Sequence, residues 1–173
     1  MEQTKRFPRI GSRHLRGAAV GALIAAVAAA AVLLAPPVRE TFYKGFGKIG
    51  QTTPFDYVLP DDGAAILIKH TGGSSSVTVP SQIDGRPVES LPGFLFFDQT
   101  YITSITIEDG ITHIEALMAL GCPNLTSITV PASVTVIEPN AFSSCGAGLT
   151  LYGPSGGAAD AYARDNNIRF ITR

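Results

Sequence analysis

The sequence predicts a mainly β solenoid, a stack of short coils with parallel strands, preceded by one transmembrane helix. Two observations carry this prediction. The first is an internal repeat: residues 103–107 (TSITI) recur as residues 126–130 (TSITV), so the period is 23. The second is an uncharged apolar stretch at residues 17–35. A repeat this short cannot bury its own apolar face, so successive copies must stack around one shared core.

The N-terminal segment is predicted to anchor the chain in a membrane. Residues 1–16 carry a net charge of +4, and the rest of the chain carries −5. Residues 17–35 are all Ala, Val, Leu, Ile or Gly, and as a helix they would span about 28 Å, close to the ~30 Å hydrocarbon core. The positive-inside rule then makes residues 1–16 a cytoplasmic tail and places everything after Pro37 outside the cell membrane. The alternative is a cleaved signal that releases a secreted module.

Residues 36–54 are expected to be a linker, because Gly and Pro are scattered among them without a strand or helix period. The repeat domain is predicted at residues 55–173. Its first strands are expected at residues 57–59 and 65–69, and the Asp-Gly pair at 62–63 signals a hairpin between them. This hairpin would cover the open N-terminal end of the stack.

Each copy of the repeat is expected to open with a short strand, because its outer residues are apolar and its middle residue is polar. The openings lie at residues 77–79, 105–107, 128–130 and 149–151. A second apolar pair follows in each full copy: Val88 and Leu91, Ile111 and Ile114, and Val134 and Ile137. Stacked in register, the openings form one narrow parallel sheet with a buried and an exposed face.

The C-terminal end is predicted to close with a helix and a strand. Residues 158–165 are compatible with a helix that presents Ala158, Ala161 and Tyr162 on one face. Residues 168–171 would follow as the last strand. This pair of elements is the expected C-terminal cap.

The candidate partner-binding residues form the exposed side of the predicted sheet. They carry hydroxyl groups, and they are Thr78, Ser104, Thr106, Ser127, Thr129 and Tyr152. Solenoid sheets serve as binding faces in other proteins. The alternative interpretation is that threonine simply suits an exposed strand position. The spacing alone leaves both interpretations open.

No pattern in the sequence predicts catalysis. There is no G-x-S-x-G, no phosphate-binding loop and no His-Glu-x-x-His motif. The histidines do not have the spacing of a zinc site, and His113 is expected to be solvated or bonded to a cap. The acidic balance of the repeat domain disfavours nucleic acid. We therefore expect a protein that is no enzyme and uses no cofactor and no metal.

Cys122 and Cys145 lie one period of the repeat apart and occupy equivalent places in adjacent copies. In a parallel ladder their Cβ atoms would lie about 4.8 Å apart, beyond the ~3.5–4.5 Å of most disulfides. We interpret them as reduced thiols that pack as small hydrophobic side chains.

The repeats resemble the BspA-type leucine-rich repeat family, a class of bacterial surface proteins. The family pattern of Ile-x-Ile-Pro, Ser-Val, Ile-x-x-x-Ala-Phe and Cys is matched at residues 128–131, 133–134, 137–142 and 145. The preceding copy matches at residues 122, 125 and 127–128, residues 83–88 resemble the first-repeat loop of the family, and residues 152–170 resemble its terminal cap. Met118-Ala119 replaces the usual Ala-Phe, and Gln99 replaces the usual Cys. The resemblance implies a leucine-rich-repeat solenoid that recognises other macromolecules outside the cytoplasm and has no chemistry of its own.

The sequence thus predicts a membrane-anchored, extracytoplasmic module that binds protein, or glycan, at the cell surface. One alternative is a structural spacer or assembly subunit of a membrane complex. The other is the secreted module that signal cleavage would release.

Overall fold

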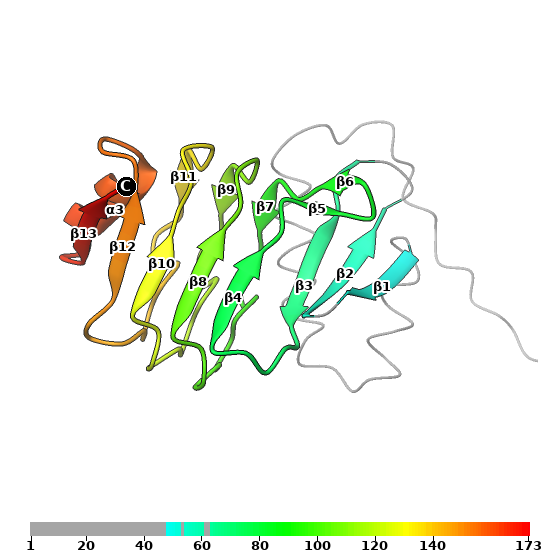
Figure 1. Ribbon diagram of the computed structural model, residues 1–173, viewed down its shortest axis with the longest axis horizontal. Helices are drawn as coiled ribbons and strands as arrows, with labels where there is room; N and C mark the ends of the chain where they lie inside the picture. The colour runs from blue at the N-terminus through cyan, green and yellow to red at the C-terminus, as the bar shows by residue number, and fades with distance from the viewer. Residues whose placement is uncertain (1–47, 53, 61–62) are drawn as a thin grey trace, which may run out of the picture.

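A computed structural model describes residues 48–52, 54–60 and 63–173. They form a solenoid of parallel strands with an antiparallel sheet at one end and a helix and strand at the other (Figure 1). The mainly β solenoid predicted from the repeat is therefore confirmed. The predicted tail at residues 1–16 and the predicted transmembrane helix at residues 17–35 lie outside the described residues. Within the described part of the chain, no helix has the length and apolar character needed to cross a bilayer.

The N-terminal end is closed by three antiparallel strands in the order β1 (Lys48–Thr52), β2 (Phe55–Leu59) and β3 (Ile66–His70). The strands β2 and β3 are the predicted hairpin. Strand β1 was not predicted, because it lies in the glycine-containing stretch expected to be a linker. Gly50 pairs with Tyr57, whose ring occupies the space where a Cβ atom would stand, so this place in the strand needs glycine.

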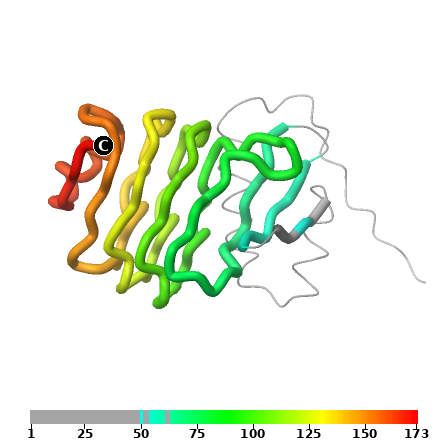
Figure 2. Tube along the Cα trace, viewed as in Figure 1, coloured from blue at the N-terminus to red at the C-terminus, as the bar shows by residue number. Residues whose placement is uncertain are grey.

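The openings of the copies form one parallel sheet, as predicted. Its strands are, in spatial order, β4 (Ser76–Val79), β8 (Ser104–Ile107), β10 (Ser127–Thr129), β12 (Thr150–Gly153) and β13 (Arg169–Thr172). We call residues 76–103 the first coil, 104–126 the second and 127–149 the third; Figure 2 shows them stacked along the long axis. The fourth opening starts one residue later than predicted, because Thr150 pairs with Ser127. Thr150 itself is buried.

A second parallel sheet, which the sequence did not predict, runs along another side of the coils. Its strands are β7 (Ser90–Leu91), β9 (His113–Ile114) and β11 (Val136–Ile137). They contain the second residue of each apolar pair. Strands this short cannot show an alternation in the sequence, so the repeat spacing was the available signal.

The extra length of the first coil forms a hairpin that holds the N-terminal sheet in place. Strands β5 (Gln82–Ile83) and β6 (Arg86–Pro87) are joined by Asp84 and Gly85, whose φ angles of 50° and 75° are those of a tight hairpin turn. The Tyr57 hydroxyl donates to Asp84 Oδ2 at 2.9 Å, and Arg86 donates to the Pro60 carbonyl.

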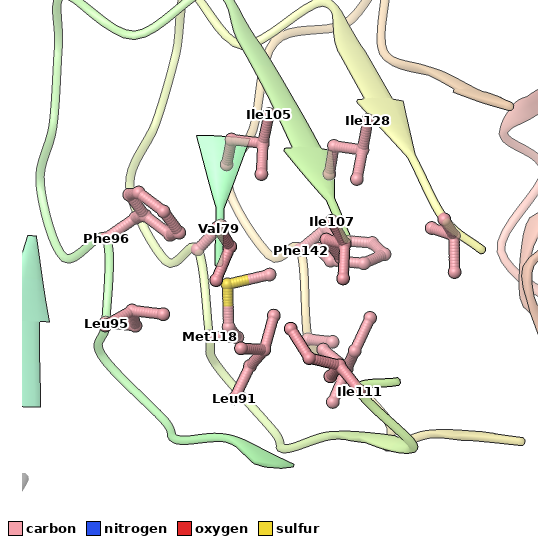
Figure 3. Packing of buried hydrophobic residues seen from close by; sticks show 14 of the residues in the cluster. Val79, Leu91, Leu95, Phe96, Ile105, Ile107, Ile111, Met118, Ile128 and Phe142 are labelled. Atoms are coloured by element: carbon pink, nitrogen blue, oxygen red, sulfur yellow. The ribbon is translucent and has the colours of Figure 1, made fainter. Parts of the chain in front are cut away.

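The coils share one hydrophobic core, part of which Figure 3 shows. Phe96, Ala119 and Phe142 occupy equivalent places and are all buried. The residue that precedes each of the last two compensates in volume: the large Met118 precedes the small Ala119, and the small Ala141 precedes the large Phe142. This exchange keeps the core filled without crowding three rings in one row.

The C-terminal cap contains the predicted helix, α3 (Ala158–Asp165), followed by β13. The predicted buried face was partly wrong: Ala159, Tyr162 and Ala163 are buried, and Ala161 is exposed. The helix is turned so that the Tyr162 ring meets the Phe142 ring edge-on, with 5.1 Å between centroids.

Candidate binding face

The sheet brings four predicted binding residues into one row. Thr78 pairs with Thr106, Thr106 with Thr129, and Thr129 with Tyr152. Thr78 and Thr106 are exposed, while Thr129 and Tyr152 are half-buried. The structure therefore places these residues as the repeat predicted.

A parallel row of hydroxyl groups lies two residues earlier in each strand. Ser104 pairs with Ser76 and with Ser127, and its Oγ donates to Ser76 Oγ at 2.8 Å. The strands β4, β8 and β10 contain no charged residue. We call the exposed side of these three strands the strand face. It is an uncharged surface of small hydroxyl side chains that both donate and accept hydrogen bonds.

From Tyr152 onward, the row carries large side chains in place of threonine. The guanidinium carbon of Arg173 lies 4.2 Å from the centroid of the Tyr152 ring, a cation–π contact. The next residue of the row is Ile171 in β13. The part of the strand face that is free of large side chains therefore ends at Thr129.

The predicted thiols bind backbone carbonyls of the preceding coil. Cys122 Sγ donates to the Phe96 carbonyl at 2.9 Å, and Cys145 Sγ donates to the Ala119 carbonyl at 3.1 Å. Both cysteines are free. Burial raises the pKa of the Cys145 thiol to about 12, so this group stays protonated and has little nucleophilic character.

Gln99 occupies the equivalent place in the first coil, and its side-chain amide also donates to a backbone carbonyl. Its Nε2 donates to the His70 carbonyl at 3.3 Å, and its Oε1 lies 3.0 Å from His70 Nδ1. Because Oε1 can only accept, the imidazole carries its hydrogen on Nδ1. His70 Nε2 is therefore unprotonated, and it is buried without a hydrogen-bond partner among the described residues.

The surroundings of His70 make it a core residue. Its ring lies 5.3 Å from the Phe55 ring and 5.2 Å from the Phe96 ring. Burial lowers the pKa of the imidazole, against the opposing effect of the Gln99 hydrogen bond. An enclosed, neutral imidazole of this kind supports packing rather than proton transfer to a substrate.

The sequence did not reveal a second ladder, made of carboxylates that recur with the period of the repeat. Glu115 accepts from the Gly93 N–H at 3.3 Å, and Glu138 accepts from the equivalent Ala116 N–H at 3.1 Å. Pro139 holds the next equivalent place, where the absence of an N–H removes the need for a third carboxylate. Burial raises the pKa of Glu115, although the hydrogen bonds to it act in the opposite direction.

His113 belongs to this ladder. Its Nε2 lies 3.1 Å from Glu138 Oε1, and both side chains are partly exposed. Within the residues that the structure describes, no group of three or more His, Cys, Asp or Glu side chains is placed to hold a metal ion.

The sequence also did not predict a hollow beside the C-terminal cap. It has a volume of about 500 Å³ and is lined by the loop around Gly148 and by Asn167, Ile168 and Arg169. Ile102 and Leu125 fill the equivalent place in the first two coils and are fully buried. Gly148 supplies no side chain there, so the core row ends in open space.

Comparison with known proteins finds a matching family model and similar solved structures. Residues 73–149 match the family model described as BspA type leucine rich repeat region, in 6 copies. A solved leucine-rich cell surface protein from Faecalibacterium prausnitzii A2-165 is 22% identical, with a TM-score of 0.45, and the match covers 72% of this chain and 30% of that one. A leucine-rich repeat protein from T. pallidum is 26% identical, with a TM-score of 0.40, and the match covers 72% of this chain and 64% of that one.

The chain thus spans less than two thirds of either solved protein. No curated protein matches it. The family model confirms the resemblance read from the sequence, since residues 73–149 match the BspA-type leucine-rich repeat region.

Proposed function

We propose that this protein is a membrane-anchored, extracytoplasmic docking module whose strand face binds another protein. The observation that supports this best is the continuous hydroxyl surface across β4, β8 and β10, where no charged residue interrupts the strands. Threonine and serine present hydrogen-bond donors and acceptors with little conformational entropy to lose, which suits recognition of a large surface.

The chemistry of the described residues supports binding rather than catalysis. The buried thiols donate to carbonyls, His70 is enclosed by aromatic rings, and His113 is paired with Glu138. None of these groups lies beside a strand-face hydroxyl as a general base would. The location rests on the sequence: residues 17–35 are long enough to span a membrane, and the basic tail precedes them.

A capture experiment with matched variants tests the proposal. The full chain, solubilised in detergent, is used to capture proteins from cell-surface extracts, which are then identified by mass spectrometry. Thr106→Lys/Thr129→Lys places two charges on the strand face. Thr112→Lys/Thr135→Lys is the control, since these threonines are also exposed and one repeat apart but lie just before β9 and β11.

We expect the wild-type chain and the control variant to capture the same protein, and the strand-face variant to capture at least tenfold less, with circular dichroism unchanged. Equal capture by both variants contradicts the proposal. Capture that resists protease but is lost after glycosidase treatment identifies a glycan partner instead. Copurification of only a membrane protein, unaffected by either variant, favours the structural spacer. An intact mass that lacks the N-terminal segment identifies the secreted module.

A further inference from the structure

The turns after β7 and β9 carry large apolar residues where the third coil carries polar ones. Phe94 and Leu117 are equivalent to Asn140, and Phe97 and Leu120 are equivalent to Ser143. We call Phe94, Phe97, Leu117 and Leu120 the apolar ridge. It lies on the turns, away from the strand face, and was not among the predicted binding residues.

The four residues of the ridge lie on adjacent turns. The Phe94 N–H donates to the Leu117 carbonyl at 3.0 Å, and the N–H of the residue after Phe97 donates to the Leu120 carbonyl at 2.9 Å. The Phe94 and Phe97 rings meet edge-on, with 5.7 Å between centroids. Phe97 is 40% exposed, and the other three residues are half-buried. The ridge is thus one continuous feature of the first two coils.

The backbone of the ridge is in a conformation that its residues rarely adopt. Phe94 and Leu117 have φ angles of 63° and 61°, in the left-handed region, and the equivalent Asn140 has 63°. Asparagine tolerates this region, whereas a bulky side chain is strained there. The fold alone therefore favours asparagine at these positions, and the apolar residues need another reason, such as a partner.

The charge around the ridge indicates the chemistry of that partner. Residues 87–163 contain seven Asp and Glu residues and no Lys or Arg. Asp98, directly after Phe97, is exposed and forms no hydrogen bond or ion pair through its carboxylate with another described residue. A surface that combines the exposed Phe97, its half-buried apolar neighbours and the exposed Asp98 carboxylate attracts a segment that combines apolar and cationic side chains.

We propose that the apolar ridge is a second docking site, and that its partner is a protein segment carrying Lys or Arg next to large apolar residues. The apolar side chains of the partner cover Phe94, Phe97, Leu117 and Leu120, and its cations face Asp98. This site is separate from the strand face and does not depend on it.

A peptide selection on the intact protein tests the site. The full chain is placed in nanodiscs of zwitterionic phosphatidylcholine, which do not attract cations by charge, and is exposed to a displayed library of short random peptides, with empty nanodiscs subtracted. The Kd of the most enriched peptide is then measured by fluorescence anisotropy at low and high salt.

The decisive variant gives the first coil the residues of the third: Phe94→Asn/Phe97→Ser. Since Asn140 and Ser143 already occupy these places in the third coil, this variant is expected to fold, and a thermal melt checks that it does. Val136→Ser is the control, because Val136 is 42% exposed on β11, about as much as Phe97.

We expect the enriched peptides to pair Lys or Arg with Leu, Ile or Phe, and to bind more weakly at high salt. The ridge variant should raise the Kd at least tenfold, while Val136→Ser and Thr106→Lys/Thr129→Lys leave it within twofold. Enrichment of neutral or acidic peptides, no enrichment, or an unchanged Kd in the ridge variant overturns the proposal. A loss of binding only in the strand-face variant also overturns it, while supporting the strand face as a docking surface.

Discussion

At the N-terminal end of the stack the row of Phe96, Ala119 and Phe142 is completed by an imidazole, and at the C-terminal end by a phenol. The backbone N–H of His70 donates to the Leu95 carbonyl at 2.9 Å, just as the Phe96 N–H donates to the Met118 carbonyl. His70 thus occupies the place that Phe96 would have in a preceding coil.

At the other end, Tyr162 supplies what a following coil would supply. The Phe142 N–H, whose equivalents bind carbonyls of the next coil, points to the Tyr162 hydroxyl at 3.4 Å. One end therefore closes with an imidazole whose Nε2 has no hydrogen-bond partner among the described residues, and the other with a phenol whose oxygen accepts a hydrogen bond. Each end of the three-coil stack thus imitates the missing neighbour, and the buried imidazole predicts that the N-terminal end is the one sensitive to acid.

The largest effect is expected from removing the C-terminal ring. Tyr162→Ala deletes a buried side chain that packs on Phe142, and it should lower the free energy of unfolding by about 3–5 kcal/mol. Tyr162→Phe keeps the ring and loses only the hydroxyl acceptor, at a cost of about 1 kcal/mol. Urea unfolding followed by circular dichroism measures both. Equal effects of the two variants would show that the ring contributes nothing.

The N-terminal end is tested by restoring the residue usual in the family. Gln99→Cys keeps a donor to the His70 carbonyl, because a thiol donates at the equivalent places, but it removes the acceptor of His70 Nδ1–H and leaves that buried group unpaired. We expect a loss of about 1–3 kcal/mol in the free energy of unfolding. Gln99→Glu is a useful comparison, because it keeps the acceptor. An unchanged stability of Gln99→Cys would contradict the role assigned to the amide.

Lowering the pH should affect the N-terminal end of the stack and not the C-terminal end. Because burial lowers the pKa of His70 in the folded state, the unfolded state binds the proton more readily below pH 6.5. Stability is then complete above pH 6.5 and falls as the pH decreases, by at most about 1.4 kcal/mol per pH unit. Unfolding measured from pH 8 to pH 5 checks this for the wild-type chain and for His70→Phe, which cannot titrate. The part of the pH dependence of the free energy of unfolding that His70 causes must disappear in the variant. An identical pH dependence in both chains would mean that another group causes it.

The smallest effect is expected in the middle of the stack. Glu138→Gln removes the ion pair with His113, but its side-chain oxygen can still accept from the Ala116 N–H. Since both side chains are partly exposed, the loss should be about 0.5–1 kcal/mol or less. Chemical denaturation at pH 6 resolves a change of this size. A loss as large as that of Tyr162→Ala would mean that the carboxylate ladder, not the ends, limits stability.

The repeat spacing predicted the solenoid, the parallel register and the alignment of Thr78, Thr106 and Thr129, because side chains at equivalent places in successive copies must stack. It did not predict the role of His70, since β3 is not a copy of the repeat and His70 does not lie one period before Phe96. It also did not predict the apolar ridge, because Phe94 and Leu117 resemble core residues in the sequence. Both lie half-buried on left-handed turns, which depend on coil geometry and not on hydrophobic pattern.

Photo-crosslinking tests the central claim, that the strand face binds a protein, most directly. The full chain is expressed in cells of its native organism. One sample carries p-benzoylphenylalanine in place of Thr106, and a parallel sample carries it in place of Thr135. The structure and the proposal predict a discrete crosslinked protein from position 106 and none from position 135. No crosslink at position 106, or the same product from both positions, would contradict the claim.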